Sequence, residues 1–227
     1  DDVRRKVRSA MTYPIFMVVF LFAMMSAMFM WIIPMFSDVY VQLGANLPAA
    51  TRKLVSLSEW ISINFSTVVL SLFGVAAGLW LASKTRRGGY IIDSIKLKTP
   101  VFGSLLNQSI LNKFSKTAGI LLNAGVPVIE AMNLIAKIVS NRVYEVAIGD
   151  ATEYIRDGFN ITSALRRTEI FPPILLQLSA TGEETGELDT LLDKAADYYY
   201  KQVNALVERM TTLIEPILIL MVGVIIG

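Results

Sequence analysis

A run of nineteen residues without a charged side chain lies near the start of the chain, from Ile15 to Ile33. Ser26 is its only polar residue. An α-helix rises about 1.5 Å per residue, so a run of this length crosses a hydrocarbon core about 30 Å thick. The run is too long for a signal peptide and has no small-residue cleavage site after it. The sequence therefore predicts a transmembrane helix over residues 13–33.

Two further apolar runs follow. The run from Phe65 to Ser83 contains serines and glycines, which membrane helices tolerate because small residues let helices approach closely, so residues 63–83 are predicted as a second transmembrane helix. Gly74 and Gly78 have the GxxxG spacing there, which predicts a homo-oligomer. The run from Ile214 is too short to span the membrane, and residues 211–227 are expected to be the truncated start of a third transmembrane helix.

The composition agrees with an integral membrane protein and excludes many enzymes. The 227 residues are 54% hydrophobic and only 18% charged, with a mean hydropathy of +0.53. A net charge of +2 does not favour nucleic acid as a partner. Without Cys or His the chain lacks a thiol nucleophile, an imidazole base and the usual zinc ligands, and it has no phosphate-binding glycine loop. We expect no catalytic residues, no cofactor and no metal site.

Basic residues predict the orientation in the membrane, because Lys and Arg concentrate on the cytoplasmic side. Residues 1–12 and 84–210 are therefore predicted to be cytoplasmic, and residues 34–62 to form an extracytoplasmic loop. The flanking cations are Arg4, Arg5, Lys6, Arg8, Lys84, Arg86, Arg87, Lys96 and Lys98, against Arg52 and Lys53 in the loop.

Residues 84–210 are predicted to form a helical bundle, so the fold class is all-α. Apolar residues recur at three- and four-residue steps, and no stretch has the alternation of a strand. Breaks are expected at "NAGVP" and "RDGFN", and Ser140 and Asn141 are expected to cap a helix between them. The longest stripe is Leu188, Leu191 or Leu192, Ala195, Tyr199, Val203, Leu206, Met210 and Leu213, and we expect that helix to enter the membrane.

The segment "GEETGELD" is the main candidate site. Its carboxylates lack the alternating spacing of a calcium loop, and no pocket residues accompany them as an acid–base pair would require. Two interpretations stay open from the residues: an acidic start to the long helix, or a turn that a partner protein recognises. The partner-contact candidates are Gly182, Glu183, Glu184, Gly186, Glu187 and Asp189.

Glu215 and Pro216 are the candidates at the membrane boundary. An ionisable residue at the start of an apolar segment is a candidate functional residue. The alternative is that Glu215 is hydrated at the membrane interface, because Arg209 lies less than two turns earlier. Pro216 is expected to kink the helix or loosen its hydrogen bonds.

Several segments, taken in order, resemble the inner-membrane platform protein family of type II secretion systems and type IV pili. The resemblance covers essentially the whole chain, and "GEETGELD" and "LIEP" are its most specific parts. Within the family, "GEETGELDTLLDKAADYY" and the "SEW" at residues 58–60 resemble the type IV pilus branch more than the secretion branch. The other segments are "KVRSAMTYP", "IIPMF", "GANLPAATR", "LKTPVFGSLL", "LLNAGVPVIEAM", "FPPILLQLSA" and "LDTLLDKAADYY".

The resemblance implies a platform that couples a cytoplasmic hexameric ATPase to pilin polymerisation or depolymerisation, alongside other inner-membrane assembly proteins. It also implies a second copy of the six-helix cytoplasmic domain, of which residues 1–12 would be the tail. The segment "NKFSKTAGIL" departs from the family pattern, because an Arg is expected near Lys113 or Lys116. A pseudopilus platform of type II secretion is the nearest alternative, and a small-molecule transporter or channel subunit is an alternative of another class.

Overall fold

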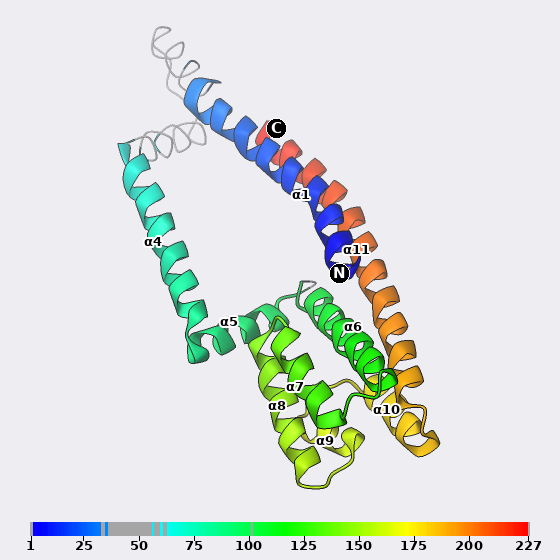
Figure 1. The fold of residues 1–227 in the computed structure, drawn as a ribbon. Coiled ribbons are helices and arrows are strands. Elements are labelled where there is room, and N and C mark those ends of the chain that lie inside the picture. The colour runs from blue at the N-terminus through cyan, green and yellow to red at the C-terminus, as the bar shows by residue number, and fades with distance from the viewer. Residues whose placement is uncertain are drawn as a thin grey trace. The chain divides into compact units, whose positions relative to one another are not determined.

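The computed structural model describes residues 2–32, 35, 56, 60, 63–100 and 102–226. Every secondary-structure element in these residues is helical, which confirms the all-α prediction. The chain divides into two compact units (Figure 1). Unit 1 consists of residues 1–3 and 83–210, and unit 2 consists of residues 4–82 and 211–227.

Unit 2 contains long helices with apolar surfaces. Its elements are α1 (Asp2–Ala27), the π-helical turn η1 (Met28–Ile32), most of α4 (Phe65–Lys84) and the last part of α11. Phe16 on α1 and Phe73 on α4 are 66% and 74% exposed. Within the described ranges, no helix combines the length and the apolar character needed to cross a membrane. The structure thus does not confirm the transmembrane part of the fold prediction. Most of the predicted loop 34–62 lies outside the described residues.

Unit 1 is a bundle in which successive helices pack on one another. Helix α5 packs on α6 and α8, α6 packs on α7, α7 on α8, α8 on α9, and α9 on α10. The helices are α5 (Arg86–Lys98), α6 (Phe102–Asn123), α7 (Val128–Ile138), α8 (Arg142–Arg156), α9 (Ile161–Arg167), α10 (Pro173–Thr185) and α11 (Leu188–Ile226), the last of which belongs to unit 1 up to Met210.

The core of unit 1 is apolar and aromatic. The ring centroids of Phe114 and Phe171 lie 5.1 Å apart, and Tyr144 meets Phe171 edge-on at 5.9 Å. Such tilted and edge-to-face contacts suit the positive edge and negative face of aromatic rings. Most of the predicted stripe on α11 is confirmed, since Leu192, Ala195, Tyr199, Val203 and Met210 are all buried.

The helix ends follow the local signals of the sequence. Gly125 and Gly158 have φ values of 75° and 94°, a conformation that glycine adopts without the Cβ clash of other residues, and they end α6 and α8. Asn141 caps α8 as predicted, because its side-chain Oδ1 accepts hydrogen bonds from the amides of Val143 and Tyr144. The predicted breaks at "NAGVP" and "RDGFN" are therefore confirmed.

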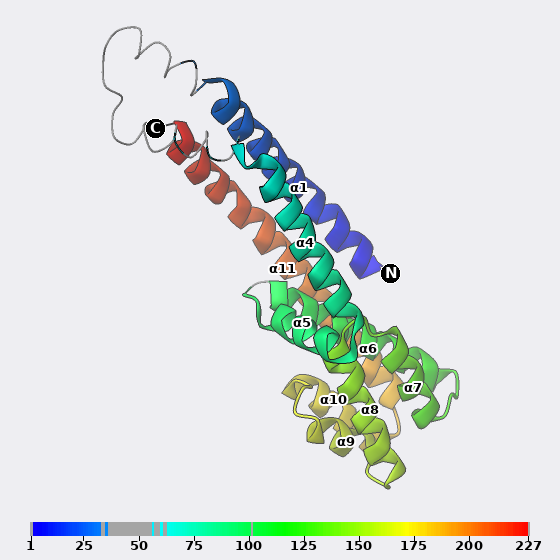
Figure 2. The same cartoon turned by 90° about the vertical axis from the view of Figure 1, so that its left-hand side faces the viewer.

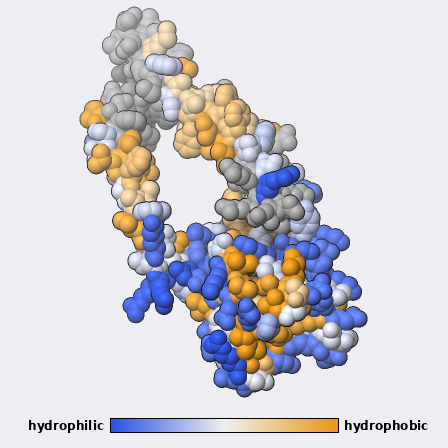
Figure 3. Space-filling model, in the orientation of Figure 1, coloured by the Kyte–Doolittle hydropathy of each residue, from blue (hydrophilic) through white to orange (hydrophobic). Residues whose placement is uncertain are grey.

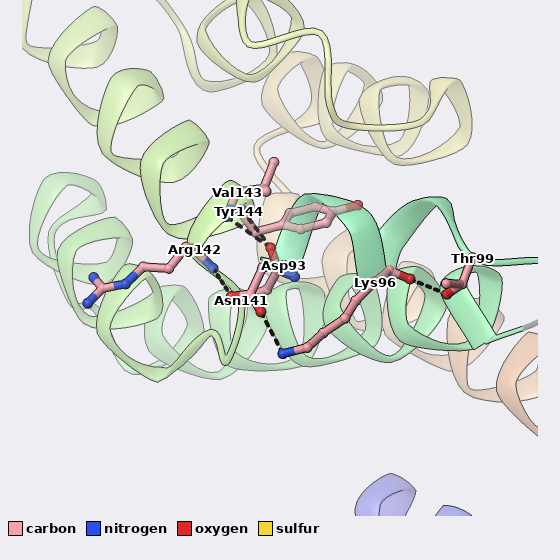
Figure 4. A network of polar contacts seen from close by, with 7 residues as sticks. All are labelled: Asp93, Lys96, Thr99, Asn141, Arg142, Val143 and Tyr144. Atoms are coloured by element: carbon pink, nitrogen blue, oxygen red, sulfur yellow. Dashed lines mark hydrogen bonds and ion pairs between the residues drawn. The ribbon is translucent and has the colours of Figure 1, made fainter. Parts of the chain in front are cut away.

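A second acceptor at the start of α8 comes from a distant helix. Asp93 on α5 accepts a hydrogen bond from the amide of Arg142 at 2.9 Å and pairs with Lys96 at 2.8 Å (Figure 4). The first amides of a helix have no partner within the helix, so Asn141 and Asp93 together satisfy three of them. This contact ties α5 to α8.

Candidate functional site

The acidic segment 182–189 is divided between two helices. Helix α10 ends at Thr185, Gly186 adopts the left-handed conformation with φ 75°, and α11 begins at Leu188. One of the two interpretations drawn from the sequence was a single turn recognised by a partner protein. The structure corrects this, because Gly182 to Glu184 lie in the last turn of α10 and only Gly186 sits where the chain reverses.

Glu183 is bound inside unit 1. Its Oε1 accepts a hydrogen bond from the amide of Ile161 at 2.6 Å, and its Oε2 accepts one from the amide of Thr162 at 3.0 Å. Asn160, the N-cap residue of α9, accepts from the amide of Ser163. The first three amides of α9 are therefore satisfied, and the negative charge of Glu183 lies at the positive end of that helix. This geometry gives Glu183 a structural role that local sequence did not indicate.

Gly182 lets the ends of two helices approach closely. A Cβ atom built on Gly182 would lie 2.7 Å from the Cα of Leu188 and 3.3 Å from its backbone nitrogen. Side chains do not tolerate such contacts with backbone atoms, so only glycine fits here without movement. Gly182 therefore shapes the hairpin between α10 and α11.

Two carboxylates of the segment face solvent. Glu184 and Glu187 are exposed on either side of Gly186, whereas Asp189 is half-buried in the first turn of α11. Of the predicted partner-contact residues, these two glutamates combine charge with exposure. They are the part of the segment that a partner can reach.

Next to the segment, α6 and α11 are joined by polar contacts. Lys116 on α6 pairs with Asp193 on α11 at 2.6 Å, and Asn112 donates to the carbonyl oxygen of Ala196 at 2.8 Å. The hydrogen bond to Asp193 raises the pKa of Lys116. A Cβ on Gly119 would lie 3.1 Å from the carbonyl oxygen of Asp189, so the two helices cross closely.

The two lysines in the departure from the family pattern both have partners. Lys113 donates to the carbonyl oxygen of Ile138 at 2.7 Å and so closes the C-terminus of α7, while Lys116 holds α11. Among the described residues each lysine makes one directed hydrogen bond, for which a point charge on a flexible stem suffices.

Two tyrosines in the core of unit 1 have strongly raised pKa values. Burial raises the pKa of Tyr144 to about 12, and burial with its neighbours Tyr198 and Tyr144 raises the pKa of Tyr199 further. The Tyr144 hydroxyl lies 3.2 Å from Oδ1 of Asn107, to which it donates, whereas the buried Tyr199 hydroxyl has no hydrogen-bond partner among the described residues. Both rings serve the core rather than a surface site.

The membrane-boundary candidates lie within α11. The helix continues through Glu215 and Pro216 as far as Ile226, and Pro216 is exposed. Across the described parts of the chain, no three His, Cys, Asp or Glu side chains are grouped so that they could hold a metal ion.

Comparison with known proteins places these features in a family. The family model described as type II secretion system (T2SS), protein F, matches residues 114–227. The chain is 38% identical to a type IV pilus assembly protein PilC of Thermus thermophilus and 32% identical to the PilC of Myxococcus xanthus, in each case over its whole length. It is 32% identical, over 99% of its length, to a type II secretion system protein F of Aeromonas hydrophila. The chain spans about half the length of these relatives, covering 56%, 54% and 58% of them respectively.

Proposed function

The chain belongs to the type II secretion system protein F family, and from that premise we propose that it is the inner-membrane platform protein of a type IV pilus assembly machine. The observation that carries the proposal is the similarity over its whole length to pilus assembly proteins, at up to 38% identity among the relatives named above. Such similarity favours an assembly protein over the small-molecule transporter considered from the sequence.

The proposed mechanism couples an ATPase to pilin. Glu184 and Glu187 would contact a basic surface of a cytoplasmic hexameric ATPase, since exposed charges steer and orient partners. Helix α11 starts next to these glutamates and runs for 39 residues, about 60 Å, so a displacement at Leu188 would be carried along it. The platform itself would hydrolyse nothing and bind no cofactor, and the ATPase would supply the energy for adding or removing pilin.

The proposed location is the bacterial inner membrane, with residues 84–210 in the cytoplasm. The apolar runs 15–33 and 65–83 have the length of membrane helices, and cations flank them on the sides predicted to face inward. Side chains such as Leu70 on α4, which is 75% exposed, would be covered by lipid there. Other inner-membrane assembly proteins and further copies of this chain are the expected neighbours.

Deleting the gene in the bacterium that encodes it tests this proposal. We expect surface pili to disappear in electron micrographs, the hexameric ATPase no longer to co-purify with the membrane fraction, and both to return on complementation. Normal piliation in the deletion strain would overturn the proposal.

A charge-reversed variant tests the ATPase contact. The double variant Glu184→Lys, Glu187→Lys keeps Glu183, which holds α9, and should abolish piliation and ATPase binding while the protein accumulates normally. The matched control, Glu130→Lys with Asp150→Lys, reverses two other exposed carboxylates of unit 1 and should leave piliation intact. Equal piliation in the two variants would remove Glu184 and Glu187 as the contact.

The second candidate is a pseudopilus platform of type II secretion, favoured by the 32% identity to the Aeromonas hydrophila protein. The same deletion strain separates the two. A pilus platform predicts lost pili with normal secretion of extracellular enzymes, and a secretion platform predicts the reverse.

A further inference from the structure

One face of helix α5 packs against the rest of unit 1. Gly89, Asp93 and Leu97 recur at four-residue steps and so lie on one side of the helix. Gly89 is buried, with a built Cβ only 3.5 Å from the Cγ of Arg142, and Asp93 binds the Arg142 amide. Leu97 packs against the core. Contacts within unit 1 therefore cover this face of α5.

The opposite face combines apolar and basic residues. Arg87, Ile91, Ile95 and Lys98 are spaced by four, four and three residues, so they form a single stripe. Ile91 is 58% exposed and Ile95 is 60% exposed. One exposed isoleucine needs no explanation, but two adjacent ones between cations make a surface with an apolar middle and basic ends. Figure 2 gives a second view of α5, which follows α4 and precedes α6 along the chain.

The charge around this stripe is strongly positive. Residues 84–98 carry five cations and one carboxylate, which gives a net charge of +4. The carboxylate, Asp93, is already paired with Lys96, and the ion pairs seen among the described residues do not include Arg86, Arg87 or Lys98. Figure 3 shows strongly hydrophilic residues gathered where α4 ends, below the apolar surface of α4. The partner of this stripe must therefore offer negative charge beside an apolar phase.

We propose that α5 lies in the interface of an anionic lipid bilayer, with Ile91 and Ile95 among the upper acyl chains and Arg87 and Lys98 at the lipid phosphates. An amphipathic helix with basic residues beside its apolar face is typical of this location. Only Thr85 separates α5 from α4, the second apolar helix, so the chain itself delivers α5 to the membrane surface. The inference rests on the membrane placement in the proposed function.

Fluorescence at single cysteines tests the proposal directly, because the native chain has none. The full chain is reconstituted in vesicles of phosphatidylcholine with phosphatidylglycerol, and an environment-sensitive probe is attached at Ile95→Cys. Brominated lipids should quench this probe several-fold more than the same probe at Ile120→Cys. Ile120 on α6 is an isoleucine of similar exposure, 56% against 60%, and is the matched control.

Reversing the charges at the two ends of the stripe is the second test of the proposal. Adding Arg87→Glu and Lys98→Glu to the Ile95→Cys chain should reduce the quenching several-fold, and so should vesicles of phosphatidylcholine alone. Quenching at residue 95 no greater than at residue 120, or quenching indifferent to both changes, would overturn the proposal. Shielding of the probe from aqueous quencher without quenching by lipid would identify a protein contact and overturn it too.

A probe at Leu72→Cys distinguishes failure of the interfacial-helix proposal from failure of the proposed function. Leu72 lies on α4 and is 64% exposed. Lipid quenching at residue 72 but not at residue 95 would refute the interfacial helix alone. Absence of quenching at both positions would refute the membrane placement as well.

Discussion

In unit 1, the first amides of α8 and of α9 each find a hydrogen-bond acceptor in a carboxylate from a distant helix. Glu183 accepts from two amides at the start of α9, and Asp93 accepts from one at the start of α8. Charged acceptors make stronger hydrogen bonds than neutral ones, and the positive end of a helix dipole adds to the attraction. Each carboxylate thus satisfies one or two part-buried amides that have no acceptor within their own helix, and it also joins two helices.

Removing the Glu183 cap should destabilise the protein. For Glu183→Ala we expect the free energy of unfolding to fall by about 1–2 kcal/mol, because amides of Ile161 and Thr162 lose their acceptor. Urea unfolding of the detergent-solubilised chain, followed by circular dichroism, measures it. Glu184→Ala removes the exposed neighbour and should change the value by less than about 0.5 kcal/mol. A Glu183 variant as stable as the Glu184 variant would contradict the capping role.

The two buried tyrosines predict a loss of stability at alkaline pH. Well below pH 10.0, the ordinary tyrosine pKa, both phenols are protonated in the folded and unfolded chains, so they cause no pH dependence. Between that pH and about 12, the unfolded chain releases its phenol protons first. The free energy of unfolding should therefore fall as pH rises through this window.

Phenylalanine variants identify the groups responsible. The double variant Tyr144→Phe, Tyr199→Phe should show a shallower fall in stability above pH 10.0 than the unchanged chain. The raised pKa of Lys116 acts in the same direction, so some slope should remain. Identical slopes in the double variant and the unchanged chain would show that the two phenols do not contribute.

At the scale of elements, the α10–α11 hairpin depends on two glycines for different reasons. Gly186 supplies a left-handed conformation at the C-cap of α10, while Gly182 is helical and supplies space for Leu188. The exposed glutamates proposed to meet the ATPase lie beside these glycines, so the hairpin geometry decides where their charges point.

Two glycine-to-alanine substitutions should have opposite effects. Gly182→Ala should destabilise the chain by about 1–3 kcal/mol, because its Cβ would overlap the backbone of Leu188. Gly149→Ala, within α8, meets no atom within 4 Å and should stabilise the chain by about 0.5–1 kcal/mol through helix propensity. Thermal unfolding of both variants checks this, and a stabilised Gly182 variant would disprove the close approach.

At the scale of the whole molecule, the two units present different surfaces. Unit 1 has a buried aromatic core, whereas the helices of unit 2 expose large apolar side chains such as Phe22 and Leu79. On α4, Gly74 and Gly78 have open space where a Cβ would stand. A helix from a second copy could approach the backbone there.

Self-association should depend on these two glycines. We expect Gly74→Leu with Gly78→Leu to reduce the oligomer mass in mild detergent, because leucine side chains keep helix backbones apart. Analytical ultracentrifugation measures the mass. Phe73→Leu with Ala76→Leu, at exposed positions on the opposite face of α4, is the control and should leave it unchanged. Equal masses for both double variants would exclude this face of α4 as the interface.

Local signals in the sequence were enough to predict that unit 1 is helical and where several of its helices end. Apolar periodicity located the buried stripe of α11, and Asn141, Gly125 and Gly158 marked boundaries, because capping and left-handed glycines depend only on near neighbours. The family resemblance was likewise present in ordered motifs along the chain. These properties are determined within a few residues of each position.

Only the tertiary structure decided which acidic residues are free. Glu183 and Glu184 are adjacent in sequence, yet the first binds amides 22 and 21 residues away and the second faces solvent. Asp93 likewise binds an amide 49 residues away. Such hydrogen bonds form only when packing brings a carboxylate to the end of another helix, and helix packing depends on the core as a whole rather than on neighbouring residues.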